Sequence, residues 1–253
     1  MAQLIQSLER GLRILEILGK SDKPLSLGEI TQFFDIDKSS IFRLLSTLTQ
    51  NNFVYQDAET KKYMLGFKIM ELSGAFGEQT KIETFLRPVL KAVCDKTRQN
   101  THLAILHGQE VVFIAVEQPR NGISMHISVG TREPVHATAL GKVLIAFAQK
   151  NEQELLLQGI SFTHYTPHTI VDGDEYRNHL SSIVQNRYAV DDEEYRLGVV
   201  CIAAPVFNHR GEVEYSIGIS GPKDQITPHI ADYITVVQDA GAECSRLLGM
   251  SSR

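Results

Sequence analysis

The sequence has few cysteines and no long hydrophobic segment. Among its 253 residues are three cysteines, Cys94, Cys201 and Cys244. They form no Cys-x-x-Cys motif or Cys/His cluster, so we expect neither a disulfide framework nor a metal site. No apolar run approaches the ~18–20 residues of a membrane-spanning helix, and residues 1–13 lack the profile of a signal peptide. We therefore expect a cytoplasmic protein that does not contact a membrane.

The sequence motifs of common enzyme classes are missing as well. The chain contains no GxSxG, HExxH, P-loop or GxGxxG sequence, so we expect no catalytic residues and no cofactor. Apolar residues make up 43% and charged residues 22%, a composition typical of globular proteins. Because ~150 residues is a usual domain size, the length of the chain predicts two domains.

The charge of the chain is unevenly distributed. The net charge is −5, which weighs against a nucleic-acid-binding protein as a whole. Residues 1–66, however, carry eight basic and eight acidic side chains, so the negative excess lies in residues 67–253. DNA binding by a neutral segment then depends on which of its faces carries the cations.

A helix-turn-helix is predicted from about Ser26 to Leu45, after a first amphipathic helix that contains leucines at steps of four and three. Ser26 and Glu29 have the spacing of a capping box, which predicts a short second helix. The third helix begins after a tight turn, with Asp37 or Ser39 as its N-cap.

The third helix is the candidate DNA-reading element. Its apolar side chains recur at i, i+3, i+4 and i+7 from Ile41, and this face must contact a core. Short hydroxyl side chains let a helix enter the major groove closely, and arginine can bind guanine. The residues expected to contact DNA lie at the start of the helix and on its opposite face, and are Lys38, Ser39, Ser40, Arg43 and Thr47.

Two short strands follow, Phe53–Gln56 and Lys62–Leu65, around a polar turn. This hairpin is predicted to be a wing whose tip residues, Lys61 and Lys62, contact phosphates. Residues 1–66 then form a winged helix-turn-helix domain. Since one such domain makes few phosphate contacts, we expect a homodimer on a two-fold double-stranded DNA operator. A small helical bundle with a solvated polar face is the alternative.

Residues 67–80 are predicted to form a linker helix that pairs with its copy in a second chain or packs on the second domain. Residues 81–253 alternate between helices and strands, which predicts an α+β domain with a largely antiparallel sheet. Its expected helices lie near Phe85–Val93 and at Thr138–Ala148, Glu175–Gln185 and Thr227–Leu248. Its expected strands are Thr101–His107, Val111–Glu117, Ile123–Val129, Tyr188–Asp191, Val199–Phe207 and Val213–Ser220.

Three segments of this second domain carry a resemblance to a known family: Gly130–Lys142, Tyr188–Phe207 and Ser216–Pro222. Together with the winged helix and the opening segment Ser7–Leu15, their order and spacing resemble the IclR family of bacterial transcriptional regulators. The resemblance covers nearly the whole chain. It implies a homodimer or a dimer of dimers, and a GAF-like domain that binds a small organic-acid or sugar-acid effector. We expect a repressor.

The resemblance also implies an effector pocket lined by these three segments. Ala139 and Leu140 match positions where the family offers backbone N–H groups at a helix start, and a carboxylate can approach such amides closely. The remaining matches are Met125 and Val199 in an apolar patch and Asp191, Cys201 and Ser220 in the pocket wall.

The chain departs from the small-acid members of the family at two positions. Gly218 stands where they carry a serine, and Glu133 stands where they carry an apolar residue. The loss of a hydroxyl donor and the gain of a carboxylate argue against a ligand like glyoxylate or pyruvate. A larger, more hydroxylated ligand is the alternative.

Several neighbouring residues have simpler structural interpretations. Asp192, Glu193 and Glu194 are expected to form a solvated charge run, and His136 is expected to be a hydrogen-bonded structural histidine. Cys201 is either a buried, inert thiol or a ligand contact. Two other functions stay open: an enzyme that acts on a small carboxylic acid, and a DNA-binding protein whose second domain only assembles oligomers.

Overall fold

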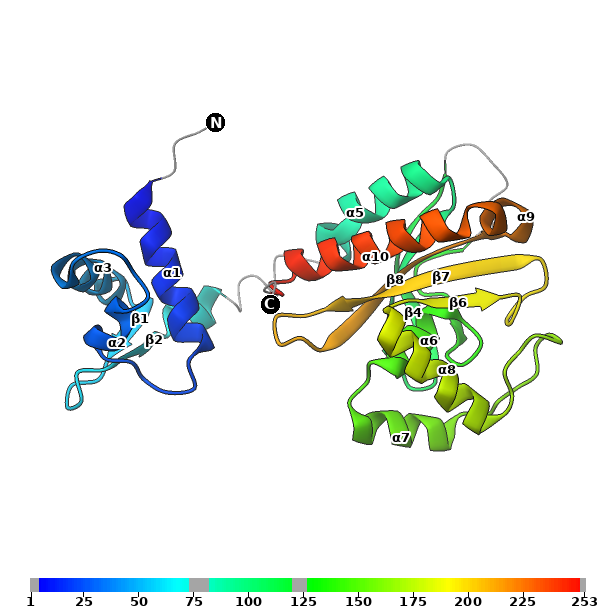
Figure 1. Ribbon diagram of the computed structural model, residues 1–253, viewed down its shortest axis with the longest axis horizontal. Coiled ribbons are helices and arrows are strands. Elements are labelled where there is room, and N and C mark those ends of the chain that lie inside the picture. The colour runs from blue at the N-terminus through cyan, green and yellow to red at the C-terminus, as the bar shows by residue number, and fades with distance from the viewer. Residues whose placement is uncertain (1–4, 73–81, 120–126, 251–253) are drawn as a thin grey trace. The chain divides into compact units, whose positions relative to one another are not determined.

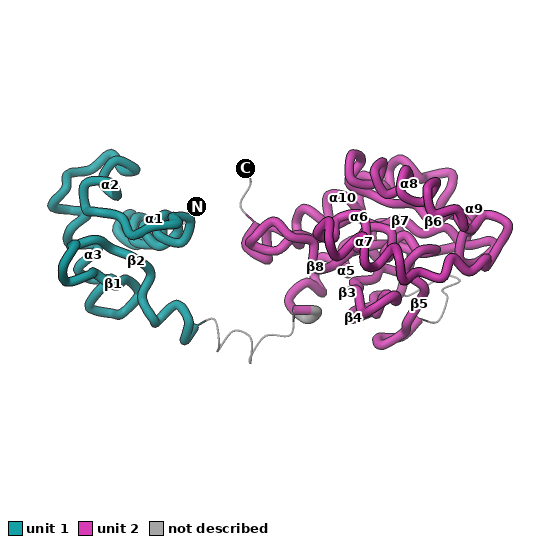
Figure 2. The backbone as a smooth tube through the Cα atoms, turned by 90° about the horizontal axis from the view of Figure 1, so that it is seen from below, with its two compact units in different colours: residues 1–81 teal, residues 82–253 magenta. Residues whose placement is uncertain are grey.

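The computed structural model describes residues 5–72, 82–119 and 127–250. The chain divides into two compact units, residues 1–81 and 82–253, which Figure 2 shows in different colours. Within the described ranges, no helix has the length and hydrophobicity needed to span a bilayer.

The N-terminal unit contains helices α1 (Gln6–Lys20), α2 (Leu27–Thr31) and α3 (Lys38–Gln50), followed by the antiparallel strands β1 (Val54–Gln56) and β2 (Tyr63–Leu65) (Figure 1). The predicted order of three helices and a hairpin is therefore confirmed. One face of each helix contributes to a single small core, formed by Ile14, Leu18, Leu25, Ile30, Ile41, Leu45, Val54 and Tyr63.

Side-chain caps begin the second and third helices. Ser26 accepts a hydrogen bond from the Glu29 amide at 3.3 Å, and the Glu29 carboxylate accepts one from the Ser26 amide at 2.7 Å, which completes the predicted capping box. Of the two predicted caps for α3, Asp37 is the one observed, since it accepts from the Ser40 amide at 2.9 Å.

The C-terminal unit is built on a six-stranded antiparallel sheet in the order β5-β4-β3-β8-β7-β6. The predicted α+β class and the antiparallel sheet are confirmed. The strands are β3 (Asn100–His107), β4 (Glu110–Glu117), β5 (Arg132–Pro134), β6 (Ala189–Asp192), β7 (Val199–Phe207) and β8 (Val213–Pro222).

Helices cover both faces of this sheet (Figure 1). Helices α5 (Ile82–Thr97) and α10 (Ile230–Leu247) pack on one face around an aliphatic core. Helices α6 (Ala139–Ala146) and α8 (Gly173–Asn186) pack on the other face, with α7 (Lys150–Gly159) beside them. The sheet is therefore the middle of three layers, and the second face carries the candidate ligand cavity.

The prediction of a strand at Ile123–Val129 is wrong where the structure describes it. Residues 123–126 lie outside the described ranges, and 127–129 form no strand. Ile127 is nonetheless buried in the core, so its apolar character reflects packing of irregular chain rather than sheet pairing. The edge strand is instead β5, which pairs with β4.

Three other features of the secondary structure differ from the predictions. The expected linker helix is helical at 68–72, and its remainder, 73–80, lies outside the described residues. The short, polar α7 was not predicted from the sequence. The last helical segment begins earlier than expected, with α9 (Lys223–Ile226) and a 3₁₀ turn (Thr227–His229) before α10.

The capping box should stabilise α2 measurably. Replacing Ser26 by alanine removes the side-chain acceptor at the helix start and is expected to lower local stability by about 1 kcal/mol. Hydrogen exchange of a peptide that covers α2 checks this, and exchange should become faster.

Ser46→Ala is the matched control, because the Ser46 hydroxyl only donates to the Phe42 carbonyl within α3 and alanine is a better helix former. Equal exchange rates in both variants would contradict the role of the cap.

Candidate nucleic-acid interface and ligand cavity

The outer face of α3 is an exposed stripe of side chains with helical spacing. Ser39, Phe42, Arg43 and Ser46 fall at i, i+3, i+4 and i+7, and all four are exposed. Phe42 is 50% exposed and was not among the residues predicted to contact DNA. An arginine beside an exposed phenyl ring suits base edges, because arginine binds guanine and phenylalanine contacts the thymine methyl group.

The three hydroxyl groups expected to contact DNA are already hydrogen-bonded to α3 or to its N-cap residue. Ser39 and Ser40 donate to the Asp37 carboxylate, and these hydrogen bonds hold the pKa of Asp37 well below its usual range. Thr47 donates to the Arg43 carbonyl at 3.0 Å. Lys38 and Arg43, in contrast, are exposed and form no ion pair with any described residue. The two cations are therefore the strongest candidates for DNA contact on α3.

The tip of the β1–β2 hairpin is held in a defined turn. The Asp57 carboxylate accepts hydrogen bonds from the amides of Glu59 and Thr60 and from the Thr60 hydroxyl. Lys61 has a positive φ of 58° and is exposed, and Lys62 is half-buried. This turn presents Lys61 to solvent, as a wing that contacts phosphate requires.

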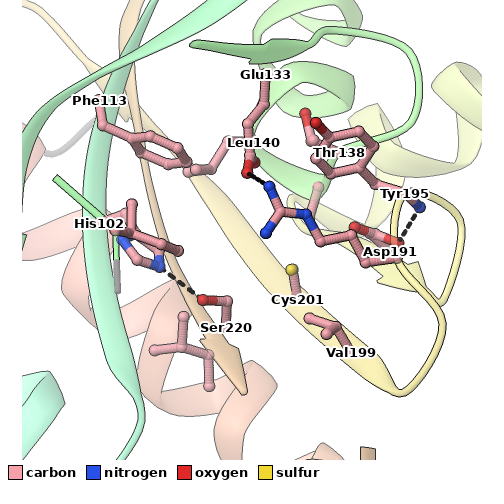
Figure 3. Close-up of a pocket in the computed structure, with 14 residues that line it drawn as sticks. His102, Phe113, Glu133, Thr138, Leu140, Asp191, Tyr195, Val199, Cys201 and Ser220 are labelled. Atoms are coloured by element: carbon pink, nitrogen blue, oxygen red, sulfur yellow. Dashed lines mark hydrogen bonds and ion pairs between the residues drawn. The ribbon is translucent and has the colours of Figure 1, made fainter. Parts of the chain in front are cut away.

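The C-terminal unit contains a cavity on the face of the sheet covered by α6 (Figure 3). Its volume is about 30 Å³, which holds one or two water molecules. Met125 lies outside the described residues. The other expected effector contacts all line the cavity, and they are Ala139, Leu140, Asp191, Val199, Cys201 and Ser220.

The first turn of α6 forms one wall of the cavity. Thr138 is the N-cap, and its hydroxyl accepts from the Gly141 amide at 3.3 Å. The amides of Ala139 and Leu140 precede it, and helix geometry leaves such groups to be satisfied by water or a ligand. A Cβ on Gly141 would lie 2.2 Å from the Val135 carbonyl oxygen, so the helix start is fixed by close backbone packing.

A row of polar side chains crosses the sheet beneath the cavity. His102 on β3 and Ser220 on β8 share a hydrogen bond of 2.7 Å, and Cys201 on β7 lies opposite both Ser220 and Asp191 in the strand register. Burial lowers the pKa of His102 to about 4 and raises the pKa of the Cys201 thiol well above its usual value. The imidazole is therefore neutral and the thiol protonated near neutral pH.

Gly218, the first departure from the family pattern, lies in the same strand as Ser220. It pairs with His102 and Ala203 on the neighbouring strands. A Cβ on Gly218 would lie 2.5 Å from the Ile202 carbonyl oxygen. A serine at this position would require β7 and β8 to move apart, so the missing hydroxyl is coupled to the local sheet geometry.

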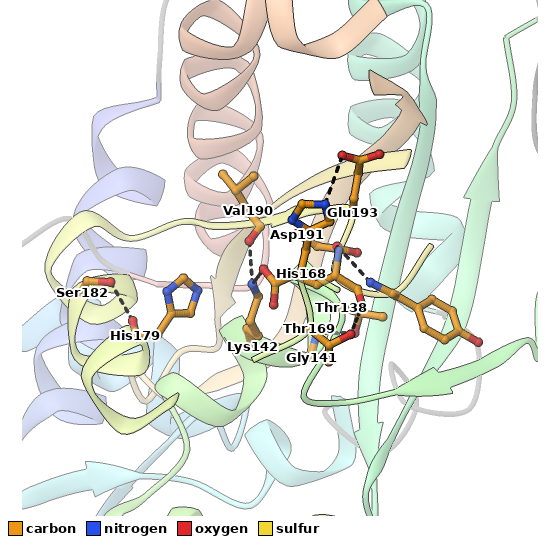
Figure 4. A network of polar contacts seen from close by, with 12 residues as sticks. Thr138, Gly141, Lys142, His168, Thr169, His179, Ser182, Val190, Asp191 and Glu193 are labelled. Atoms are coloured by element: carbon orange, nitrogen blue, oxygen red, sulfur yellow. Dashed lines mark hydrogen bonds and ion pairs between the residues drawn. The ribbon is translucent and has the colours of Figure 1, made fainter. Parts of the chain in front are cut away.

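The expected solvated charge run is wrong for Glu194, whose carboxylate forms an ion pair with the fully buried Lys142 of α6. Lys142 also donates to the Val190 carbonyl at 2.6 Å (Figure 4). Burial raises the pKa of Glu194, and Lys142 opposes this rise. An isolated buried ammonium is very unfavourable, so Lys142 requires this carboxylate in the interior.

Glu193 also differs from the expected solvated residue. Its carboxylate accepts from the Gly198 amide at 2.7 Å and forms an ion pair with Lys223. Lys223 also binds Asp192, which is the exposed member of the run. Lys223 is the first residue of α9 and is remote in sequence, whereas Gly198 lies in the loop itself. Together these contacts close residues 193–198 into an ordered loop.

Asp191 anchors the start of this 193–198 loop. Its carboxylate accepts from the amides of Glu194 at 2.7 Å and Tyr195 at 3.3 Å. Burial raises the pKa of Asp191 to about 6, while Lys142 and the amides oppose the rise. The loop places Tyr195 and Arg196 at the cavity.

The structure adds cavity residues that the sequence did not reveal. His102 and Phe113 come from the central strands, and Tyr195 and Arg196 come from the 193–198 loop. Strand alternation places His102 on the same sheet face as the cavity, but no sequence spacing connects it with Ser220. Arg196 lies in a loop without any periodic signal.

His136 is a structural histidine, as expected, because its Nε2 is hydrogen-bonded to the Thr163 carbonyl at 3.0 Å. Burial lowers the pKa of His136. Across the described part of the chain, no three His, Cys, Asp or Glu side chains come together in a group suited to a metal ion.

The chain matches known protein families over most of its length. Residues 7–58 match the IclR helix-turn-helix domain, and residues 76–246 match the C-terminal domain of bacterial IclR transcriptional regulators. The HTH-type transcriptional regulator XynR of Escherichia coli (strain K12) is 34% identical over 247 residues, which are 97% of this chain and 98% of that protein.

Two further proteins are similar to the chain over nearly its whole length. The HTH-type transcriptional repressor AllR of Escherichia coli (strain K12) is 29% identical over 98% of this chain and 92% of its own length. The crystal structure of the repressor BlcR from Agobacterium tumefaciens has a TM-score of 0.80 and 23% identity, and covers 99% of this chain and 100% of that chain. The fold of the whole chain is therefore that of these regulators.

Arg43→Ala should weaken binding to the DNA upstream of the protein's own coding sequence by about 1–3 kcal/mol. Arg43 is exposed on α3, so the fold should be unchanged. Fluorescence anisotropy at fixed ionic strength measures the affinity.

The control is Arg177→Ala, which removes an exposed arginine from α8 in the other unit. A footprint and an affinity unchanged by Arg43→Ala would refute the placement of α3 in the groove.

Asp191 should make stability depend on pH. Its pKa is raised from 3.8 to about 6, so between these values the folded protein holds a proton that the unfolded chain releases. The stability that depends on this proton is lost as the pH rises through that window. Asp191→Asn keeps an acceptor oxygen but cannot ionise. Relative to the wild type, its unfolding free energy should rise by about 3 kcal/mol between about pH 4 and pH 7.

Denaturant unfolding at several pH values tests this. Asp174→Asn, a change at an exposed carboxylate, should show no such rise. A pH-independent difference between the Asp191→Asn and wild-type proteins would contradict the raised pKa.

Proposed function

The chain belongs to the IclR family of bacterial transcriptional regulators, and from this premise we propose that it is a repressor whose operator affinity is controlled by a small organic acid or sugar acid bound in the C-terminal cavity. The observation that carries the effector part of the proposal is the cavity itself, in which the first amides of α6 meet a buried row of polar side chains. The protein is a DNA-binding regulator, and in this proposal the N-terminal unit binds DNA and the C-terminal unit binds the effector.

The DNA partner is proposed to be contacted by α3 and the wing. Arg43 and Lys38 on α3 and Lys61 and Lys62 on the hairpin are the cations, with Ser39, Ser40 and Thr47 beside them. So few cations per unit favour a homodimer on a two-fold operator, since specific affinity generally needs two half-sites. A dimer of dimers stays open as the assembly.

The class of the effector follows from the groups that face the cavity. Amides at a helix start and the positive end of the helix dipole favour a carboxylate. Ser220 and Asp191 can serve ligand hydroxyl groups, and Val199 and Leu140 provide apolar contacts. AllR and BlcR are repressors by name, which supports repression for this chain.

Catalysis in the cavity is a weaker hypothesis. The Cys201 thiol stays protonated because burial and the neighbouring Asp191 raise its pKa, whereas a nucleophilic cysteine needs a depressed pKa. His102 hydrogen-bonds Ser220, but burial lowers its pKa to about 4, which makes the imidazole a weak base. These groups support binding rather than turnover.

The DNA partner and the three free cysteines support a cytoplasmic location.

A thermal-shift screen against small organic acids tests the proposal, because a ligand that binds only the folded protein raises the melting temperature. Ser220→Ala should reduce the shift caused by the best acid, since Ser220 lines the cavity. The affinity for operator DNA without acid should stay unchanged.

Ser182→Ala on α8 is the control, because its hydroxyl donates to the His179 carbonyl outside the cavity. If no acid stabilises the wild-type protein, the second domain serves assembly alone. If Ser220→Ala abolishes the dimer instead, the cavity is not the effector site.

A further inference from the structure

Two charged side chains from different elements meet at the cavity. Arg196 of the 193–198 loop donates to the Glu133 carboxylate of β5 at 3.2 Å, the ion pair drawn at Glu133 in Figure 3. Glu133 is 10% exposed and Arg196 is 48% exposed. Both residues line the cavity, so this ion pair is part of its wall.

The charges around the cavity disfavour a simple acid. The described lining residues carry two carboxylates, Glu133 and Asp191, and one guanidinium, that of Arg196. Arg196 is already paired with Glu133. Suppose that an acid without other polar groups formed an ion pair with Arg196. The Glu133 carboxylate would then be buried without a partner, which is strongly unfavourable.

An acid with several hydroxyl groups can replace both partners of the pair. Its carboxylate can contact the α6 amides and accept two hydrogen bonds from Arg196, while a hydroxyl group donates to Glu133. Asp191 has one oxygen engaged with the amides of Glu194 and Tyr195 and can accept from a second hydroxyl group through the other. No charge is then left without a partner.

Glu133 borders two spaces of different volume, and this difference bears on how a ligand enters the cavity. The cavity volume is about 30 Å³, too small for an organic acid, whereas a neighbouring groove of about 400 Å³ is also lined by Glu133 and Tyr195. Glu133 therefore borders both spaces. Arg196 is half-exposed whereas Glu133 is largely buried, so a ligand can part this pair at low cost only if it gives Glu133 a new hydrogen-bond donor. Arg196 keeps its stacking contact with Tyr195, in which its Cζ lies 4.9 Å from the centroid of the ring.

We propose that Glu133 and Arg196 are the specificity-determining pair of the effector site, and that they select polyhydroxylated monocarboxylic acids of the aldonic class over unsubstituted acids. This inference rests on the proposed function of the cavity. It assigns the selectivity to two residues that are far apart in the sequence.

The test is isothermal titration calorimetry of the full chain with the linear four- to six-carbon aldonates and with unsubstituted carboxylates of the same lengths. The wild type should bind its best aldonate at least ten times more tightly than the matching unsubstituted acid. Glu133→Leu should reduce this ratio at least tenfold, because it removes the hydroxyl acceptor and frees Arg196 for a simple carboxylate. Arg196→Gln should weaken the binding of both classes of acid.

Two further variants control for folding and for the mere loss of an ion pair. Glu133→Gln keeps the side-chain shape and should give an intermediate ratio. Glu117→Leu breaks an ion pair with Arg87 at 2.7 Å that lies outside both the cavity and the groove, and should leave the ratio unchanged.

The outcomes separate the inference from the function on which it rests. If unsubstituted acids bind the wild type as tightly as aldonates do, or if Glu133→Leu retains the preference, the specificity pair is refuted while an acid effector stands. If no acid of either class binds the wild type, the proposed effector function fails, and the inference fails with it.

Discussion

The cavity-bearing side of the C-terminal unit depends on one buried lysine. Lys142 has no exposed surface, yet it lies in α6, whose residues are otherwise small or apolar. Its ammonium group must be compensated in the interior, and the compensation comes from Glu194 and from the Val190 carbonyl. This contact attaches the helix whose first amides face the cavity to the strand and loop that complete the cavity wall. A change at Lys142 would therefore disturb α6, β6 and the 193–198 loop together.

The cavity combines rigid and less constrained parts. The α6 amides and the His102–Ser220 hydrogen bond lie on helix and sheet, so their positions are fixed by packing and strand register. The 193–198 loop is held at its start by Asp191 and by the ion pair between Glu193 and Lys223. At its end, the Lys223 amide donates to the Gly198 carbonyl at 2.8 Å. Between these anchors, the half-exposed Arg196 meets Glu133. The proposed selectivity is thus assigned to a contact with one half-exposed partner, while the α6 amides proposed to bind the carboxylate are held by helix packing.

The sequence predicted features that depend on local periodicity and on short motifs. Helical spacing identified the buried and exposed faces of α3, and Ser26 with Glu29 identified a helix start. The family segments located Asp191, Cys201 and Ser220, which the structure brings to one cavity. The errors have a common physical cause. Glu193 and Glu194 looked solvated because their partners, Lys223 and Lys142, are distant in sequence, and the same distance hid the pairing of His102 with Ser220 and of Arg196 with Glu133.

The central claim is that acid binding in one unit and DNA binding in the other are coupled. Thermodynamic linkage requires the coupling to be reciprocal, and typical couplings change affinity 5- to 150-fold. The most direct measurement is the affinity of the full chain for its best acid, determined with and without saturating operator DNA at one salt concentration. A repressor released by its effector should bind the acid at least about fivefold more weakly on DNA. Equal acid affinity in the two states would contradict the account.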